Sequence, residues 1–528
     1  MSSSLATQTA APTSAPPRAH GGSVRGAGEP GRGWTRGQVV VLLLLAAVPV
    51  VGWLPFLDAP LSSDESGYLL LARHWAPGTS LYGDYWVDRP PLLLWLFALA
   101  GHLGGGHLTP AGLAAPALKL MGATAGALAV VASGALGGLL APGSRWSRWG
   151  GPVLTAALLT SPMFGMPETD GEILALPLVL LGLTCFVAAF RLPWNRRSLL
   201  LAVVSGAAAM AAALVKQNIV DVFVFAAVVL ALAHRSTSRP WAKAGAFAAG
   251  SVATLVAVLA GAAARGTTPA AVWDATVVFR LQASGVISSS ASAQTSERWS
   301  RMVSAYVGSG AAAVLVVAAV LALLGVYRTR RSSAPLLWAA LAMTAWELFG
   351  AAAGGSYWLH YLTGLLPGLV ALVALAHPAR RGAFVLSALL LYVAGSSATA
   401  WIHHDDRPVS VSADAQVATY LRDHARPSDG VVVAFGHPNI VADSGLASPY
   451  EHLWSLPVRV RDPRLGELEN VMSGPRSPRW IVVSGSRLDS WGLDARDAQR
   501  YLQGHYVEQQ SYGDWHIWRE TRTPASPD

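Results

Sequence analysis

The stretch that decides the fold begins at Val39, reads VVVLLLLAAVPVVGWLPFL and ends at Leu57. A helix needs roughly 20 apolar residues to cross a bilayer, and this run is of that length. It is followed at once by DAPLSSDESGY, residues 58–68, which brings acidic and aromatic side chains and no small-residue cleavage site. A removed signal peptide would end at such a site, so the run predicts a retained membrane anchor.

The composition of the whole chain is typical of a membrane protein. Of its 528 residues, 52% are hydrophobic and only 13% are charged, whereas soluble domains carry about 25% charged residues. A soluble multidomain enzyme and a disordered scaffold are therefore excluded. The single cysteine, Cys185, excludes an intramolecular disulfide and a cysteine-based zinc site. Abundant Gly and Ala favour closely packed transmembrane helices.

Ten further apolar stretches follow the first. The sequence thus predicts eleven spanning helices, at residues 39–57, 112–140, 150–166, 172–190, 198–214, 219–233, 242–263, 305–326, 335–353, 358–377 and 383–400. The apolar residues 90–104 are too few to span, and we interpret them as a short re-entrant or interfacial helix that dips into the outer leaflet.

The loops between these stretches alternate in charge. Six segments, namely 1–36, 142–149, 191–197, 234–243, 327–334 and 378–382, together hold 17 Lys or Arg and one acid, Glu29. The acids gather instead in 58–111 and 163–172. Because Lys and Arg favour the cytoplasmic side, the N-terminus is predicted to be cytoplasmic and the chain after Trp401 extracytoplasmic. The net charge of +8 reflects this topology, so no nucleic-acid partner is expected.

The chain is predicted to have three parts. Residues 1–36 form a disordered cytoplasmic tail, 37–400 a transmembrane domain with the external loop 58–111, and 401–528 an extracytoplasmic α/β domain. In the last part the patterns predict helices at 413–424 and 495–504 and strands at 431–435, 480–484 and 512–518.

Two acidic groups lie in the external loops. Asp64 and Glu65 follow the first span, and Glu168, Asp170 and Glu172 lie between two later spans. Carboxylates at the membrane surface are costly unless they are solvated or functional. The alternative is structural: either group can stabilise a helix start, with Ser63 or Asp64 as the N-cap in the first loop.

Basic and aromatic side chains are expected on the same outer side. Lys119 and Lys216 oppose the positive-inside trend, which indicates an anion such as a phosphate at the outer leaflet, or a lysine stem that snorkels to the interface. His360 and Tyr361 precede a late span, where interfacial belt residues are also common. Acids, cations and a histidine on one face suit a metal or sugar site that faces an anionic lipid headgroup.

At these residues the chain resembles the GT-C superfamily of integral membrane glycosyltransferases, and within it the bacterial relatives of dolichyl-phosphate-mannose protein mannosyltransferases and aminoarabinose transferases. The matching features, over about residues 37–400, are Asp64-Glu65, Tyr82-Gly83-Asp84 leading to Arg89-Pro90-Pro91-Leu92, Leu118-Lys119-Leu120, Glu168-Thr169-Asp170, and His360-Tyr361 before Leu365-Leu366-Pro367. A looser match extends through Gly436-His437-Pro438.

The resemblance implies a GT-C fold and transfer of a sugar from a polyprenyl-phosphate-linked donor to a glycan, lipid or protein acceptor outside the cytoplasm. It assigns catalysis to Asp64, Glu65 and Asp170, and a divalent metal ion to Asp88 and Glu168. The donor phosphate is assigned to Arg89, Lys119, Lys216, His360 and Tyr361. The family commonly has Lys before the Pro-Pro pair and Arg opening the second span. This chain has the opposite arrangement, with Arg89 before the Pro-Pro pair and Lys119 in the second span. Arginine and lysine bind phosphate with different geometries.

Two other classes of protein stay open from the sequence. One is a transporter or flippase of lipid-linked sugars, which would need charges deep within several spans. The other is a non-catalytic membrane assembly subunit that presents its tail to partners. Release of polyprenyl phosphate from a labelled lipid-linked sugar would distinguish the enzyme from both.

Overall fold

The computed structural model describes residues 34–104, 114–142, 144–289, 293–328, 333–376, 379–405, 412–489 and 493–521. The predicted disordered tail, residues 1–36, lies outside these ranges except for its last three residues. Arg36 is already the first residue of a helix, whose N-cap Thr35 accepts a hydrogen bond from the Gln38 backbone N–H.

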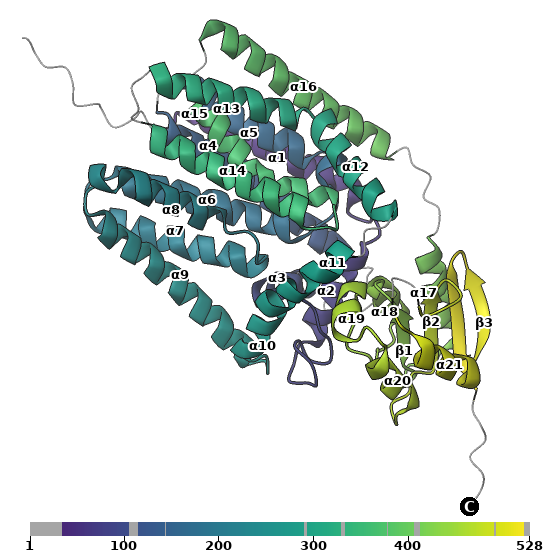
Figure 1. The fold of residues 1–528 in the computed structure, drawn as a ribbon. Helices are drawn as coiled ribbons and strands as arrows, with labels where there is room; N and C mark the ends of the chain where they lie inside the picture. The colour runs from purple at the N-terminus through teal and green to yellow at the C-terminus, as the bar shows by residue number, and fades with distance from the viewer. Residues whose placement is uncertain are drawn as a thin grey trace, which may run out of the picture. The chain divides into compact units, whose positions relative to one another are not determined.

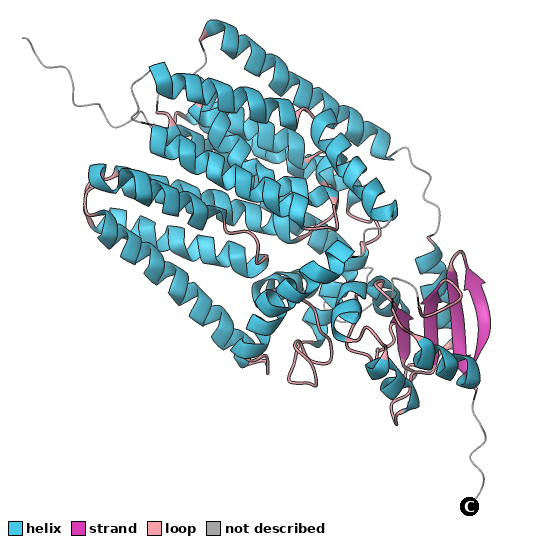
Figure 2. Cartoon of the chain, viewed as in Figure 1, coloured by secondary structure: helices cyan, strands magenta, loops and turns pink. Residues whose placement is uncertain are grey.

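Helices make up most of the described chain (Figure 1, Figure 2). Their bounds are α1 Arg36–Trp53, α2 Ser63–His74, α3 Pro91–Leu103, α4 Ala114–Leu140, α5 Arg145–Leu159, α6 Gly171–Arg191, α7 Arg196–Val215, α8 Asp221–Ala233, α9 Pro240–Ala263, α10 Pro269–Trp273, α11 Phe279–Ser289, α12 Ala293–Gly308, α13 Ala311–Arg328, α14 Ala334–Ala353, α15 Leu366–Leu375, α16 Arg380–Asp405, α17 Ala413–His424, α18 Pro438–Ser444, α19 Ser455–Arg461, α20 Gly466–Ser473 and α21 Arg496–His505. A 3₁₀ turn, η5 (Leu359–Leu365), leads into α15.

Eight helices of the described chain, α1, α4, α6, α7, α9, α13, α14 and α16, are long and apolar enough to cross a membrane. The other three predicted spans are also helical, as α5, α8 and the apolar segment Leu359–Leu375, but each is shorter than these eight. The chain is therefore a multi-pass membrane protein. The predicted short apolar helix at 90–104 is confirmed as α3, which has 13 residues and packs against α2, α4, α7 and α9.

Small residues let the spanning helices pack closely. At Gly206 on α7, an added Cβ would lie 1.8 Å from the Phe247 carbonyl oxygen on α9. At Gly250 on α9, it would lie 2.0 Å from the Val203 carbonyl oxygen. Only glycine permits such backbone approach, so the Gly and Ala content does mark tightly packed helices.

The strands of the described chain form one four-stranded sheet in the C-terminal part, with the order β1-β2-β4-β3. Strand β1 (Val431–Ala434) pairs in parallel with β2 (Trp480–Ser484), and β2 pairs antiparallel with β4 (Trp515–Glu520), with Val482 opposite Ile517. Strand β3 (Tyr506–Tyr512) pairs antiparallel with β4. The predicted combination of helices and a small sheet in the C-terminal part is therefore present.

One predicted element of this domain is wrong. The prediction joined residues 512–518 into a single strand, but a turn at Gly513 and Asp514 divides them between β3 and β4. Gly513 has φ +57°, a left-handed conformation that glycine adopts without steric cost. A two-residue Gly-containing loop between strand-like runs is a hairpin signal that could have been found in the sequence.

Candidate functional site

The start of α2 presents the first acidic pair. Its N-cap is Ser62, not Ser63 or Asp64 as predicted, because Ser62 and Glu65 form a reciprocal capping box. Asp64 is thereby free of a capping role and partly exposed. Its Oδ1 accepts a hydrogen bond from the indole Nε1–H of Trp454, 2.8 Å away, and its Oδ2 accepts one from the Tyr68 hydroxyl at 3.3 Å.

Glu65 and Lys119 form a buried ion pair. The Lys119 ammonium donates to Glu65 Oε1 at 2.7 Å, to Glu65 Oε2 at 2.8 Å and to the Pro167 carbonyl at 2.7 Å. Glu65 also accepts from the Thr169 backbone N–H at 2.8 Å. Both side chains are almost fully buried. Burial raises the pKa of Glu65 above its ordinary value, although the Lys119 charge opposes this. The pair therefore joins α2, α4 and the second acidic loop.

The second acidic loop meets His360. Asp170 is the N-cap of α6, and its Oδ1 accepts from the backbone N–H groups of Glu172 and Ile173. His360 Nδ1 lies 3.1 Å from Asp170 Oδ2 and 3.3 Å from Glu168 Oε2. Burial raises the pKa of Glu168, but the hydrogen bond and the charge of His360 outweigh it and lower this pKa to about 2.

Burial, together with the negative charges of Glu172 and Glu168, raises the pKa of Asp170, although the charge of His360 opposes this. One potential ligand atom from each of Glu168, Asp170 and His360 lies within 4.8 Å of the others. This arrangement fits a divalent cation, because carboxylates and an imidazole converge there and Asp170 Oδ2, although 3.1 Å from His360 Nδ1, accepts no hydrogen bond from the described residues.

Lys216 also lies near this loop. It follows the last residue of α7 and pairs with Glu172 in the first turn of α6. Its ammonium is 4.7 Å from the centre of the Tyr361 ring, in a cation–π contact. The simple snorkelling alternative is therefore replaced by a specific ion pair, and Tyr361 is placed beside a cation.

Asp88 and Arg89 form the third part of the site. Asp88 Oδ1 pairs with Arg89 at 2.8 Å, and its Oδ2 pairs with Arg280 of α11 at 2.9 Å. Asp88 lies outside both groups of three potential metal ligands found in the described chain. The Arg89 guanidinium lies 5.8 Å from the centre of the Tyr68 ring, and its backbone carbonyl accepts from the Tyr82 hydroxyl at 2.5 Å.

These parts belong to one electrostatic network. Burial lowers the pKa of Arg89, but Asp88, Tyr68, Asp64 and Tyr361 raise it more, so that its net pKa is raised. The charge of Arg89 therefore interacts with Asp64 and Asp88 of the first external loop and with Tyr361, which precedes α15. Residues predicted from separate loops are therefore brought into contact, and Lys119, predicted to hold the donor phosphate, pairs with Glu65.

Two partners in this network were not found from the sequence. Arg280 lies in a predicted external segment and opposes the positive-inside trend, the same sequence signal that marks Lys216. Trp454 has no comparable signal, because it reaches Asp64 from 390 positions further along the chain.

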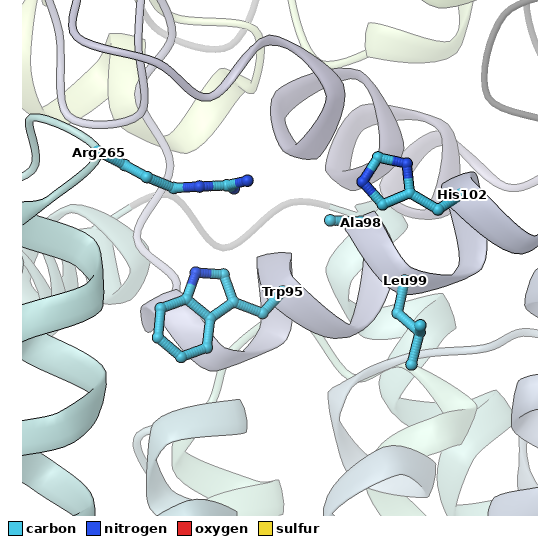
Figure 3. Close-up of a pocket in the computed structure, with 5 residues that line it drawn as sticks. All are labelled: Trp95, Ala98, Leu99, His102 and Arg265. Carbon is cyan, nitrogen blue, oxygen red and sulfur yellow. The ribbon is translucent and has the colours of Figure 1, made fainter.

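A separate cavity of about 310 Å³ is lined by Trp95, Ala98, Leu99 and His102 of α3 and by Arg265, which follows α9 (Figure 3). In this view the Arg265 guanidinium lies above the Trp95 ring, on the side opposite His102. None of the acids or cations described above lines it.

No protein-family model matches the chain, and no curated protein does so by sequence. Solved structures do match it. ArnT from Cupriavidus metallidurans bound to undecaprenyl phosphate is 14% identical, with a TM-score of 0.53 over 94% of this chain and 100% of that one. The Archaeoglobus fulgidus oligosaccharyltransferase in complex with Zn and sulfate is 13% identical, with a TM-score of 0.52 over 84% and 68%.

A second structure of the archaeal protein, named AglB and in complex with an inhibitory peptide and a dolichol-phosphate, is 13% identical with a TM-score of 0.52. It is matched over 92% of this chain and 75% of that one. At such identities the likeness shows the fold. The resemblance read from the sequence is thus confirmed at that level, and the chain has the GT-C fold of ArnT and of the archaeal oligosaccharyltransferase.

Proposed function

We propose that this protein is a membrane glycosyltransferase that moves a sugar from a polyprenyl-phosphate-linked donor to an acceptor on the outer face of the cytoplasmic membrane. The observation that carries the proposal is that Arg89 interacts with Asp64 and with Tyr361, the residue after His360 of the Glu168–Asp170–His360 group, in a GT-C fold. ArnT was solved with undecaprenyl phosphate and AglB with a dolichol-phosphate, which favours a donor of this class here.

The chemistry follows from the residues of the network. Asp64 is the general base: it takes the proton of the acceptor hydroxyl as the acceptor oxygen forms its bond to the sugar C1. The bond from C1 to the donor phosphate breaks, and the polyprenyl phosphate leaves with the electron pair. Arg89 stabilises the negative charge of this leaving group, since a guanidinium can engage two phosphate oxygens. The acceptor is a glycan, a lipid or a protein.

Glu168, Asp170 and His360 would hold a divalent cation if one is bound. Such a cation would supply positive charge close to the departing phosphate. Glu65 and Lys119 act at a distance from the reacting atoms: their ion pair holds the start of α2, and so Asp64, against the second acidic loop. The direct test is release of polyprenyl phosphate from a labelled lipid-linked sugar by purified protein. No release with any lipid-linked sugar supplied, beside a working control enzyme, would contradict the proposal.

Arg89→Ala is expected to weaken binding of a polyprenyl-phosphate-linked donor by about 10- to 100-fold, the value of a hydrogen bond to a charged group. Arg280 already pairs with the second oxygen of Asp88, so Arg89 can turn to a phosphate without leaving Asp88 alone. Arg89→Lys keeps the charge but loses the planar fork, and it should lie between wild type and Arg89→Ala. Donor dissociation constants measure the effect.

Lys216→Met serves as the comparison in the same assay. It should weaken donor binding less than Arg89→Ala does, because Lys216 is already engaged by Glu172. Unchanged donor affinity in both Arg89→Ala and Lys216→Met would contradict the proposed binding of the donor phosphate by these two residues. The proposed function would then rest on the acidic residues alone.

The orientation has its own test. A reporter that is active only outside the cytoplasm, fused after Trp401, is expected to be active, because Arg-rich loops alternate with acidic ones. The same reporter inserted in the basic segment 191–197 is the control and should be inactive. Activity in 191–197 and none after Trp401 would invert the topology and move the proposed site to the cytoplasmic face.

A further inference from the structure

A second group of potential metal ligands lies in the C-terminal domain, apart from the network described above. Glu451 and His452 precede α19, and Glu467 lies in the first turn of α20. One potential ligand atom from each lies within 4.8 Å of the others. His452 Nε2 is 3.4 Å from Glu451 Oε1 and 3.7 Å from Glu467 Oε2.

These distances do not fit ordinary hydrogen bonds. An N–H···O bond has its donor and acceptor about 2.9–3.0 Å apart, and both contacts are longer. Two ligands on one tetrahedral Zn²⁺, each about 2.0–2.2 Å from the ion, lie roughly 3.3–3.6 Å from each other. The two distances from His452 Nε2 to the carboxylates are therefore closer to the separation of ligands around a shared ion.

The imidazole of His452 is held in place by its neighbours but lacks good hydrogen bonds. The His452 side chain is only 2% exposed, and its Nδ1 has no hydrogen-bond partner among the described residues. The rings of Trp86 and Tyr450 pack against it edge to face, with centroids 6.0 and 5.5 Å away. The other ring nitrogen, Nε2, faces the two carboxylates at 3.4 and 3.7 Å, beyond the length of an ordinary hydrogen bond. A buried imidazole without a short hydrogen bond on either nitrogen is costly, which favours a ligand between Nε2 and the carboxylates.

The charges around the group call for a cation. Arg461 is a basic residue close to this group, but it already pairs with Asp274 at 2.7 Å and lies over the Trp86 and Phe279 rings. Asp462 is occupied as well: it accepts from the Tyr450 hydroxyl and from the backbone N–H groups of Glu467 and Leu468. These bonds fix the start of α20 and leave the Glu467 carboxylate directed at His452.

We propose that Glu451, His452 and Glu467 bind a Zn²⁺ ion. One imidazole nitrogen and two carboxylate oxygens are ligands that zinc accepts, and Glu467, whose side chain is 45% exposed, leaves a side open for a water as fourth ligand. Zinc binding at this site does not require the proposed glycosyl transfer.

The bound ion fastens the C-terminal domain to the external loop. The Glu451 backbone carbonyl accepts a hydrogen bond from the Trp86 N–H at 3.0 Å, and the segments around Trp86 and His452 lie parallel. Trp86 comes two residues before Asp88. An ion that fixes residues 451 and 452 therefore also fixes the loop segment that carries Asp88 and Arg89.

The test is zinc binding by the full-length protein in detergent. After equilibrium dialysis against Zn²⁺ and removal of free metal, the zinc per chain is measured by elemental analysis. Glu467→Gln and His452→Gln should each hold one zinc fewer than wild type. His516→Gln is the matched control, because His516 pairs with Glu508 at 2.7 Å on the exposed hairpin and belongs to neither group of three potential ligands found among the described residues. It should bind zinc like wild type.

Zinc bound by Glu168, Asp170 and His360 is distinguished from zinc at the proposed site by repeating the measurement in a His360→Gln background. In that background Glu467→Gln should again remove one zinc. Zinc should also raise the thermal unfolding temperature of wild type and His516→Gln, and not that of Glu467→Gln. If His452→Gln does not fold, Glu467→Gln, changed at a half-exposed side chain, still decides. Equal zinc content and equal thermal shift in wild type and Glu467→Gln would overturn the proposal.

Discussion

Asp64→Asn is expected to insert and fold like wild type and to transfer sugar about 10²–10⁴-fold more slowly, the usual contribution of a general base. The change removes the base but keeps the shape of the side chain. Asparagine retains a carbonyl oxygen that can accept the Trp454 indole N–H, now 2.8 Å from Asp64 Oδ1. Turnover of a labelled polyprenyl-linked donor, normalised to folded protein, measures the effect.

Asp58→Asn is the control for this variant. Asp58 lies in the same external loop and is exposed, so its neutralisation should leave turnover unchanged. Because Ser62 and Glu65 cap α2 without help from Asp64, a loss of activity in Asp64→Asn would not come from a lost helix cap. Wild-type turnover by a well-inserted Asp64→Asn protein would show that Asp64 is not the base.

Lys119→Met is expected to destabilise the folded protein by about 3–5 kcal/mol, the cost of removing one partner of a buried ion pair. The Lys119 ammonium makes all three of its hydrogen bonds to Glu65 and Pro167, and the variant leaves the Glu65 carboxylate buried beside no cation. Thermal or denaturant unfolding in detergent measures the loss. The sequence resemblance assigned this lysine to the donor phosphate, so the result separates a structural role from a binding role.

The double variant Glu65→Gln/Lys119→Met is the control. It removes both charges, and it should recover a large part of the stability that Lys119→Met loses, because no buried charge is left unpaired. Donor affinity of the folded fraction should stay close to that of wild type. If Lys119→Met has wild-type stability but binds the donor more weakly, Lys119 instead binds the donor phosphate, as the resemblance implied.

The polar contacts around Asp88 show which parts of the site local sequence patterns can predict and which they cannot. The sequence placed Asp88 and Arg89 in an external loop and proposed a metal ligand and a phosphate ligand. In the fold Asp88 is held between two guanidinium groups, of Arg89 and of Arg280. The second of these comes from a helix nearly two hundred residues away, and neither spacing nor charge alternation contains that pairing.

The sequence by itself determined the membrane-spanning helices, the alternation of basic and acidic loops between them, and, in the C-terminal domain, the helices α17 and α21 and the strands β1 and β2. These follow from hydropathy, loop charge and residue periodicity, which act over a few tens of neighbouring residues. Helix α17, predicted at 413–424, has those bounds in the structure, because its apolar spacing and N-cap are local.

Only the tertiary structure decided the partner of each charge: Lys119 with Glu65, Lys216 with Glu172, His360 with Asp170, and Trp454 with Asp64. Each choice depends on which helix ends meet when the spans pack. That packing is set by close backbone approaches such as Gly206 to Phe247 and by the cost of leaving a buried charge unpaired, and both are properties of the assembled fold.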